Sequence, residues 1–221
     1  MNSTMQKPSN STRPRLPREL RLPAVLAAVV VILLLVRAVL SALAPGGPSA
    51  AGTLPDEVPD APEWVTRELL PINQYSRPGK KLTAVNGVVV HYTGNPGTTA
   101  EQNRSYFAGL AETGETFASS NFVVGLDGEI LECVPLDEVA YASSQRNYDT
   151  LSIEVCHPDD TGAFNQASYD ALVKLVQWLI DTYHLDRDQI LRHYDVTGKE
   201  CPRYYVQHPE AWEAFLDDLT F

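Results

Sequence analysis

The sequence is poor in basic residues outside its N-terminal stretch. Over 221 residues, 17 Lys and Arg stand against 28 Asp and Glu, which gives a formal net charge of −11. In the first 44 positions Glu19 is the only acidic residue, and the basic residues there are Lys7, Arg13, Arg15, Arg18, Arg21 and Arg37. The rest of the chain is therefore strongly acidic. Because phosphate binding requires a clustered basic surface, this charge excludes nucleic acid as an expected partner.

No repeat period is visible, and the chain has only three cysteines. The absence of a repeat argues against a solenoid, and residues 63–221 suffice for one domain with its own hydrophobic core. Cys133 and Cys156 fall in two segments with strand-like composition. In an exported domain they would form either a disulfide or two buried free thiols, and both alternatives stay open.

Long apolar runs are also missing, with one exception from Pro23 to Ala44. As a helix this segment would reach ~33 Å, about the thickness of the hydrocarbon core. Arg37 lies near its outer end, where a long side chain can reach the interface. The basic residues 1–22 precede the run, and such flanks stay in the cytoplasm. We therefore predict a single-pass signal-anchor in the cell membrane, a transmembrane helix at 23–44, with the following domain extracellular.

A cleaved signal peptide is the alternative interpretation of the same segment. Ala42 and Ala44 are small residues of the kind that a signal peptidase requires, although Pro45 follows them. Cleavage would yield a secreted domain without an anchor. Residues 45–62 are rich in Pro and Gly and are predicted to form a flexible linker to the domain at 63–221.

Residues 63–221 alternate between strand and helix patterns. The predicted strands cover residues 82–92, 121–126, 129–134, 150–156 and 190–193. The predicted helices cover residues 63–70, 99–112, 165–183 and 209–219. Asp127-Gly128 indicates a hairpin turn between two strands, and Asn165 is suited to cap the longest helix. This arrangement predicts an α/β domain with a single mixed β-sheet that is flanked by helices on both faces.

His91, His193 and Cys201 form a candidate metal site, although each taken singly is as readily a packed or solvated residue. His91 ends the apolar run Val88–Val90, so we expect it at the open edge of a buried strand. His193 and Cys201 share one short segment, with Gly198 between them to let the chain turn back. Two imidazoles and one thiolate leave one zinc position open to water, as catalytic zinc sites require. The set therefore predicts one Zn²⁺ per domain.

Four segments strengthen this interpretation: Val-Val-Val-His-Tyr-Thr-Gly-Asn (88–95), Ser-Asn-Phe-Val-Val-Gly-Leu-Asp-Gly-Glu-Ile (120–130), Leu-Ser-Ile-Glu-Val (151–155) and Arg-His-Tyr-Asp-Val-Thr-Gly-Lys-Glu-Cys-Pro (192–202). In this order they resemble the motifs of zinc-dependent N-acetylmuramoyl-L-alanine amidases, the family of phage lysozyme-type amidases and peptidoglycan-recognition proteins. The resemblance covers roughly residues 85–205 and implies the fold of that family. It also implies peptidoglycan or a muropeptide as partner, cleaved at the amide between N-acetylmuramic acid and L-alanine.

Glu154 and Lys199 are the predicted catalytic residues. Glu154 lies among apolar residues on an inner strand, where a carboxylate is costly unless it has a partner or a task. Amide hydrolysis needs a base that takes a proton from water and gives it to the leaving amine, which is the task we assign to Glu154. The resemblance agrees, since one branch of the family has a glutamate on this strand. Lys199 would stabilise the oxyanion.

The sequence departs from the family pattern at Ser120, where the phage branch carries a tyrosine. The resemblance therefore places the proton transfer on Glu154. Cys201 groups the chain with the family members that use a thiolate ligand, whereas some animal relatives lack this cysteine and only bind peptidoglycan. Cys201 accordingly favours catalysis over binding alone.

The remaining polar candidates lie on loops that should surround the metal. The residues predicted to contact the muropeptide are Tyr92, Asn95, Arg146, Asn147 and His157. Asp195 is expected to stabilise the loop of His193, while His184 and His208 are expected at the surface near helix ends.

Two rival hypotheses accompany the zinc amidase. The first is a non-catalytic peptidoglycan-binding module. The second is a cysteine hydrolase that uses Cys156 with His157 or His91. Adjacent residues of a strand point to opposite faces, which argues against the pair Cys156 and His157.

Overall fold

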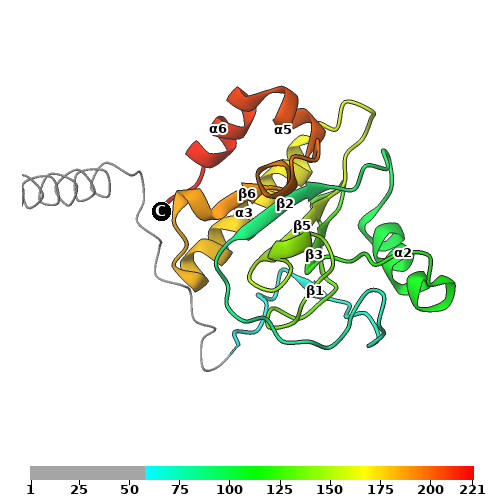
Figure 1. Ribbon diagram of the computed structural model, residues 1–221. Helices are drawn as coiled ribbons and strands as arrows, with labels where there is room; N and C mark the ends of the chain where they lie inside the picture. The colour runs from blue at the N-terminus through cyan, green and yellow to red at the C-terminus, as the bar shows by residue number, and fades with distance from the viewer. Residues whose placement is uncertain (1–57) are drawn as a thin grey trace, which may run out of the picture. The chain divides into compact units, whose positions relative to one another are not determined.

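The computed structural model describes residues 58–221 (Figure 1). The predicted basic tail (1–22), the predicted membrane segment (23–44) and most of the predicted linker lie outside the described residues. Among residues 58–221, none of the helices combines the length and the apolar content that a membrane span requires. Residues 58–62, which we assigned to the linker, include Val58 and Ala61, and both pack against the hydrophobic core of the domain.

One mixed sheet forms the centre of the domain. Its strands are β1 (Thr66–Arg67), β2 (Val88–Tyr92), β3 (Phe122–Val124), β4 (Ile130–Glu132), β5 (Leu151–Val155) and β6 (Ile190–Arg192). They lie side by side in the order β1-β4-β3-β5-β2-β6. Only β3 and β4 pair antiparallel; every other neighbouring pair is parallel. The prediction of a single mixed sheet is therefore confirmed.

The helices are α2 (Ala100–Thr113), α3 (Gln166–Tyr183), α4 (His193–Thr197), α5 (Arg203–Gln207) and α6 (Pro209–Asp217), with 3₁₀ turns η1 (Ser144–Arg146) and η2 (Arg187–Gln189). Thr99 and Asn165 cap α2 and α3, and each accepts a hydrogen bond from the backbone N–H three positions later. These bonds satisfy donors that the first helical turn leaves free, and the predicted positions of α2, α3 and α6 are confirmed within about two residues.

One predicted helix is wrong. Residues 63–70 contain the edge strand β1 instead, which pairs with β4. Beyond β1, Glu68 and Leu70 continue the ladder, since their N–H groups donate to the carbonyl oxygens of Glu132 and Cys133 at 3.0 and 2.9 Å. Pairing with the sheet edge thus overrides the local helical preference of this segment. The short helices α4 and α5, of five residues each, were not predicted.

The two faces of the sheet are covered differently. On one face, side chains such as Val90, Phe122 and Ile153 share a large apolar core with residues of α3 and α6. On the other face, Val123 of β3 belongs to a smaller core with Phe107 of α2. Helix α2 packs against β3 and β4 (Figure 1). His91 of β2 and Ser152 and Glu154 of β5 point to this second face, and these two strands carry the candidate site.

Candidate metal centre and its pocket

Three parallel strands bring the predicted residues to one edge of the sheet. In the β2–β5 pair, His91 lies opposite Glu154. In the β2–β6 pair, Val90 lies opposite Arg192, so the next residues, His91 and His193, emerge beside each other. Their ring centroids are 4.6 Å apart. The carboxyl ends of parallel strands are a common place for a site, because the residues that end or follow neighbouring strands emerge at the same end of the sheet.

The loop after β6 returns Cys201 to the two histidines. Asp195 fixes its start: the carboxylate accepts hydrogen bonds from the Arg192 backbone N–H at 2.8 Å and from its guanidinium at 2.7 Å. Gly198 then ends α4 with a φ of +78°, a conformation that side chains of L-residues disfavour. The N–H of Tyr194 donates to the Cys201 carbonyl at 2.9 Å and closes the loop. Asp195 thus stabilises the loop of His193, and Gly198 lets the chain turn back toward Cys201, as predicted.

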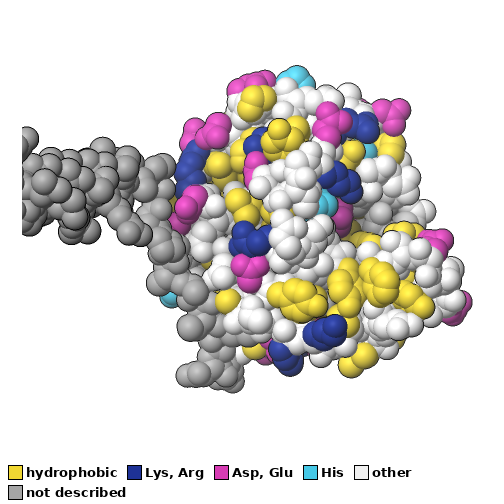
Figure 2. Space-filling model, in the orientation of Figure 1, with side chains coloured by type: hydrophobic (Ala, Val, Ile, Leu, Met, Phe, Trp, Pro, Cys, Tyr) yellow, Lys and Arg dark blue, Asp and Glu magenta, His cyan; other side chains and the backbone are white. Residues whose placement is uncertain are grey.

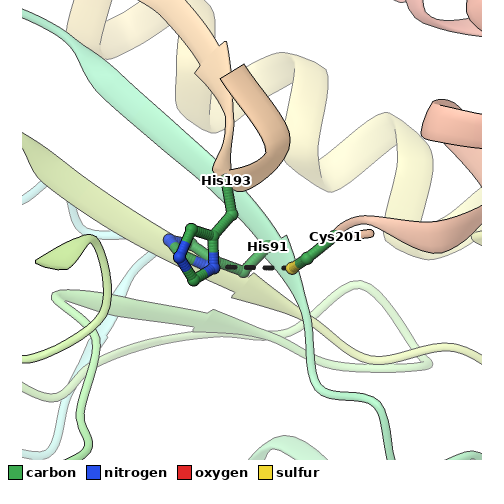
Figure 3. A group of neighbouring side chains, drawn as sticks. All are labelled: His91, His193 and Cys201. Atoms are coloured by element: carbon green, nitrogen blue, oxygen red, sulfur yellow. Dashed lines mark hydrogen bonds between the residues drawn. The ribbon is translucent and has the colours of Figure 1, made fainter. Parts of the chain in front are cut away.

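His91, His193 and Cys201 point toward one another, as Figure 3 shows. All three are buried, and one potential ligand atom from each lies within 4.8 Å of the others. The Cys201 Sγ is 3.8 Å from His91 Nδ1. Tetrahedral zinc would place sulfur and nitrogen ligands roughly 3.6 Å apart. The Nδ1 atom of His193 is buried and has no hydrogen-bond partner, so its lone pair is available. The residues therefore fit a zinc ion.

Ser143 fixes the orientation of the His91 ring. Its Oγ lies 3.2 Å from His91 Nε2 and is buried. If Nε2 carries the proton and donates to Ser143, the opposite nitrogen, Nδ1, keeps a lone pair that faces Cys201. Asn147 holds Ser143 in turn, because its side-chain oxygen accepts from the N–H groups of Ser143 and Ala142 at 2.6 and 3.1 Å.

The environment favours neutral imidazoles. Burial lowers the pKa of His91 well below its ordinary value, and the neighbouring His193 and the positive charge of Lys199 lower it further. Burial and Lys199 also lower the pKa of His193. In contrast, burial raises the pKa of the Cys201 thiol to about 12, against the opposing effects of a Tyr92 backbone hydrogen bond and Lys199. A metal ligand must be deprotonated. The neutral histidines can therefore bind a metal ion directly, whereas the Cys201 thiol would release its proton on binding.

Glu154 and Lys199 line the same cavity, which has a volume of about 300 Å³ and also contains the three candidate ligands. The Glu154 Oε2 atom is buried and has no hydrogen-bond partner. Burial raises the pKa of Glu154 to about 8, while Lys199 acts in the opposite direction. A half-buried carboxyl group with an unused oxygen and a raised pKa is suited to exchange protons near neutral pH.

The five residues predicted to contact substrate have different environments. Tyr92 lines the cavity, and Asn95 lines a neighbouring cavity of about 320 Å³. Arg146 pairs with Asp149 at 2.8 Å, outside the cavity. The side-chain oxygen of Asn147 accepts a hydrogen bond from the Ser143 backbone N–H. His157 is buried, stacks on Tyr92 with ring centroids 5.0 Å apart, and has its Nδ1 2.7 Å from the Asp159 carbonyl. Arg146, Asn147 and His157 do not line the central cavity, and their contact with substrate stays a prediction.

Sequence reasoning missed several residues of the site. Phe117, Tyr141 and Thr93 line the cavity, and Ser143 contacts a candidate ligand. Only Thr93 had a signal, since it follows the His91 strand inside a recognised motif. The other three lie in loops, where spacing does not reveal orientation. Ser120 stands outside the cavity and donates from its buried hydroxyl to the Phe122 carbonyl at 2.7 Å.

The other two cysteines are buried and free. Of the two alternatives for Cys133 and Cys156, the structure has the separate thiols. Both belong to the small core beside α2. Burial raises the pKa of Cys156 to about 12, and its thiol is not part of the cavity. A cysteine nucleophile needs an accessible thiolate, so the cysteine-hydrolase hypothesis has no support in this geometry.

A family comparison agrees with this site. The family described as N-acetylmuramoyl-L-alanine amidase matches residues 81–204, more than half of the chain. The chain belongs to this family. All three candidate ligands, Glu154 and Lys199 lie inside the matched range.

Bacterial relatives in this amidase family match about two thirds of this chain. A probable N-acetylmuramoyl-L-alanine amidase of Bacillus licheniformis is 35% identical over 163 residues, which cover 68% of this chain and 46% of that protein. The N-acetylmuramoyl-L-alanine amidase BlyA of Bacillus subtilis is 32% identical over 171 residues, or 68% of this chain and 45% of that protein. The chain thus spans about half the length of these relatives.

Solved structures show the same fold. The catalytic domain of XlyA aligns with a TM-score of 0.59 and 23% identity over 71% of this chain and 99% of that chain. PlyL aligns with a TM-score of 0.61 and 20% identity, over 71% of this chain and 97% of its own. At this level of identity the likeness concerns the fold.

Proposed function

We propose that this protein is a zinc-dependent N-acetylmuramoyl-L-alanine amidase, which hydrolyses the amide between N-acetylmuramic acid and L-alanine in peptidoglycan. One observation carries the proposal: the buried ligand set His91, His193 and Cys201 opens into the same cavity as Glu154 and Lys199. A metal centre beside a proton-exchanging carboxylate and a cation contains what amide hydrolysis requires. Family membership supplies the bond that is cut.

The chain's own residues have distinct tasks. Glu154 accepts a proton from the attacking water and delivers it to the nitrogen of the departing L-alanine. Its raised pKa makes both transfers feasible near neutral pH. Lys199 provides a positive charge for the carbonyl oxygen as negative charge develops there. Ser143 and Asn147 keep the His91 ring in its ligand orientation.

Bound zinc would act as a Lewis acid and would lower the pKa of water to ~7. His91 and His193 would contribute neutral nitrogens and Cys201 a thiolate, which leaves a fourth position free. This is the zinc arrangement of hydrolytic rather than purely structural sites.

The proposed location is the outer side of the cell membrane. Residues 23–44 would anchor the chain and residues 45–62 would connect it to the domain, which would then lie on the cell-wall side of the membrane. Cleavage after the apolar segment would make the same domain a secreted enzyme. A tryptic-peptide and N-terminal analysis of the mature protein in membrane and medium fractions distinguishes the two arrangements.

The function is tested by incubating the full-length chain with purified peptidoglycan. We expect release of stem peptides with a free L-alanine amine, abolished by a chelator and restored by Zn²⁺. Binding to the wall without release, at full zinc occupancy, would instead identify a peptidoglycan-binding module and overturn the proposal.

The base is tested by Glu154→Gln, which keeps the shape of the side chain and removes its proton chemistry. We expect the rate to fall about 10²–10⁴-fold, with zinc content unchanged. Glu200→Gln is the matched control, because Glu200 is an exposed carboxylate next to Cys201 that is not part of the central cavity. An undiminished rate in Glu154→Gln would remove Glu154 from its assigned role.

A further inference from the structure

An exposed aromatic side chain stands at the mouth of the metal cavity. Phe117 is 58% exposed, although it is one of the most apolar residue types. It nevertheless lines the cavity together with Tyr141 and with Phe107 from α2. Figure 2 shows hydrophobic side chains gathered on this face of the molecule, beside α2. Exposed apolar surface at the rim of a pocket commonly marks a place where a ligand is bound.

Phe117 contacts two other aromatic rings. Its ring centroid lies 5.3 Å from that of Tyr75 and 5.5 Å from that of Tyr141. These distances fall within the range in which aromatic pairs attract each other. The three residues therefore form one wall, which we call the aromatic wall (Tyr75, Phe117 and Tyr141).

Hydrogen bonds fix the backbone behind the aromatic wall. The N–H of Ala118 donates to the Tyr75 carbonyl at 3.1 Å, and the N–H of Ser119 donates to the Tyr141 carbonyl at 3.1 Å. The Ser119 hydroxyl accepts from the N–H of Tyr141 at 2.9 Å. Three distant segments are thus joined directly beside Phe117, and its ring is presented without a large loss of freedom on binding.

The charged side chains of the cavity do not belong to the aromatic wall. Apart from the candidate ligands, the ionisable groups that line it are Glu154, Lys199 and the two tyrosines Tyr92 and Tyr141. Lys199 and Glu154 come from the loop after α4 and from β5, whereas the aromatic wall is uncharged. A substrate with one uncharged half and one anionic half would therefore place its uncharged half on the aromatic wall. In a muropeptide, the saccharide ring has an apolar C–H face, while the stem peptide carries carboxylates.

We propose that the aromatic wall is the saccharide subsite, with Phe117 packed against the C–H face of a pyranose ring of the glycan. This inference rests on the proposed function and adds where the sugar side of the scissile bond lies. Burial of one exposed ring against a sugar face supplies affinity through removal of apolar surface from water and through the preferred geometry of the ring. The stem peptide then occupies the part of the cavity near Lys199.

The test is a titration, followed by NMR, of the zinc-loaded full-length chain with the peptide-free disaccharide of N-acetylglucosamine and N-acetylmuramic acid. The lactyl carboxyl group of the disaccharide is blocked as its methyl amide, so that the probe is uncharged like the saccharide half of the substrate. Phe117→Ala should raise the Kd about tenfold, and Phe117→Tyr should restore the affinity to within about twofold. Tyr148→Ala is the matched control, because Tyr148 is 45% exposed and outside the cavity. It should bind like the unaltered protein.

A second titration uses the stem peptide without saccharide, for which Phe117→Ala should leave the Kd unchanged. An unchanged disaccharide Kd in Phe117→Ala, an equal loss for the stem peptide, or no disaccharide binding by the unaltered chain would each overturn the inference. None of these measurements requires amide cleavage. Failure of the saccharide subsite is therefore distinguishable from failure of the amidase activity, which the release of stem peptides reports.

Discussion

The two faces of the sheet differ in composition and in role: one packs the large apolar core, and the other carries the candidate metal site. The face beneath α3 and α6 is closed by side chains such as Phe122 and Phe215, both with 0% exposure, and contains apolar residues throughout. The opposite face is closed by α2 only over β3 and β4, and beside it stand His91 and Glu154. Buried polar groups without partners cost free energy. One face therefore supplies the stability that allows the other face to keep buried ionisable groups without partners.

The largest expected effect is on the closed face. Phe215→Ala should lower the free energy of unfolding by about 3–5 kcal/mol, because it removes a fully buried ring and leaves a cavity. Denaturant unfolding measures this change. The folded fraction should bind Zn²⁺ with unchanged affinity. Phe221→Ala, at a position 48% exposed, should change stability by less than about 0.5 kcal/mol. If Phe215→Ala weakened zinc binding strongly, the two faces would not be separable as described.

A smaller effect is expected on the face that carries the candidate metal site. Ser143→Ala removes the partner of His91 Nε2 and should weaken Zn²⁺ binding about 10–100-fold. Competition with a chromophoric chelator measures the affinity without any turnover. Ser143→Thr keeps the hydroxyl and should recover most of the loss. Ser144→Gly, which changes a neighbouring residue at φ 52°, should leave the affinity unaltered. Equal affinity in Ser143→Ala would show that the ring needs no such support.

The smallest expected effect concerns Glu154 in the metal-free protein. Its pKa rises from 4.5 to about 8 in the folded state. The folded protein therefore holds this proton more tightly than the unfolded chain, and stability is lost as pH rises from about 4.5 through about 8. Glu154→Gln cannot ionise and lacks this loss. Between pH 5 and pH 8 the full shift corresponds to about 3.5 kcal/mol. Because the Glu154 side chain is partly exposed, solvent screening reduces the expected difference between the unaltered protein and the variant to roughly 2 kcal/mol.

Urea unfolding with chelator present, at several pH values, measures this difference. His91 and His193 are common to both proteins. Their lowered pKa values cause the opposite trend, with stability lost as pH falls, and this trend cancels in the comparison. Parallel pH profiles for the two proteins would show that burial of Glu154 costs nothing.

The strongest sequence patterns predicted the fold where local and tertiary preferences agreed. The periodic helix ending at Tyr183, its Asn165 cap and the Asp127-Gly128 hairpin were all confirmed. The segment 63–70 was wrong, because its conformation depends on an edge of β4 that lies more than 60 positions away in the chain. The composition of a short segment cannot predict a pairing with a strand so distant in the sequence.

The candidate ligands were predictable because motifs with fixed spacing place them on strands and on one short loop. Glu154 was predictable because an acidic residue interrupts a buried strand. Ser143 and Phe117 could not be found in this way. A serine or a phenylalanine in a loop acquires its role only when the loop folds over the sheet, and the sequence contains no period that fixes this orientation.

The ligand set has a consequence for how the chain is held together. His91 and Cys201 are separated by 110 positions, yet their side chains meet at 3.8 Å. An ion bound by both residues would cross-link the first inner strand to the C-terminal quarter of the domain. Because such a tie forms only in the folded state, zinc supply would set the domain's resistance to proteolysis as well as its activity.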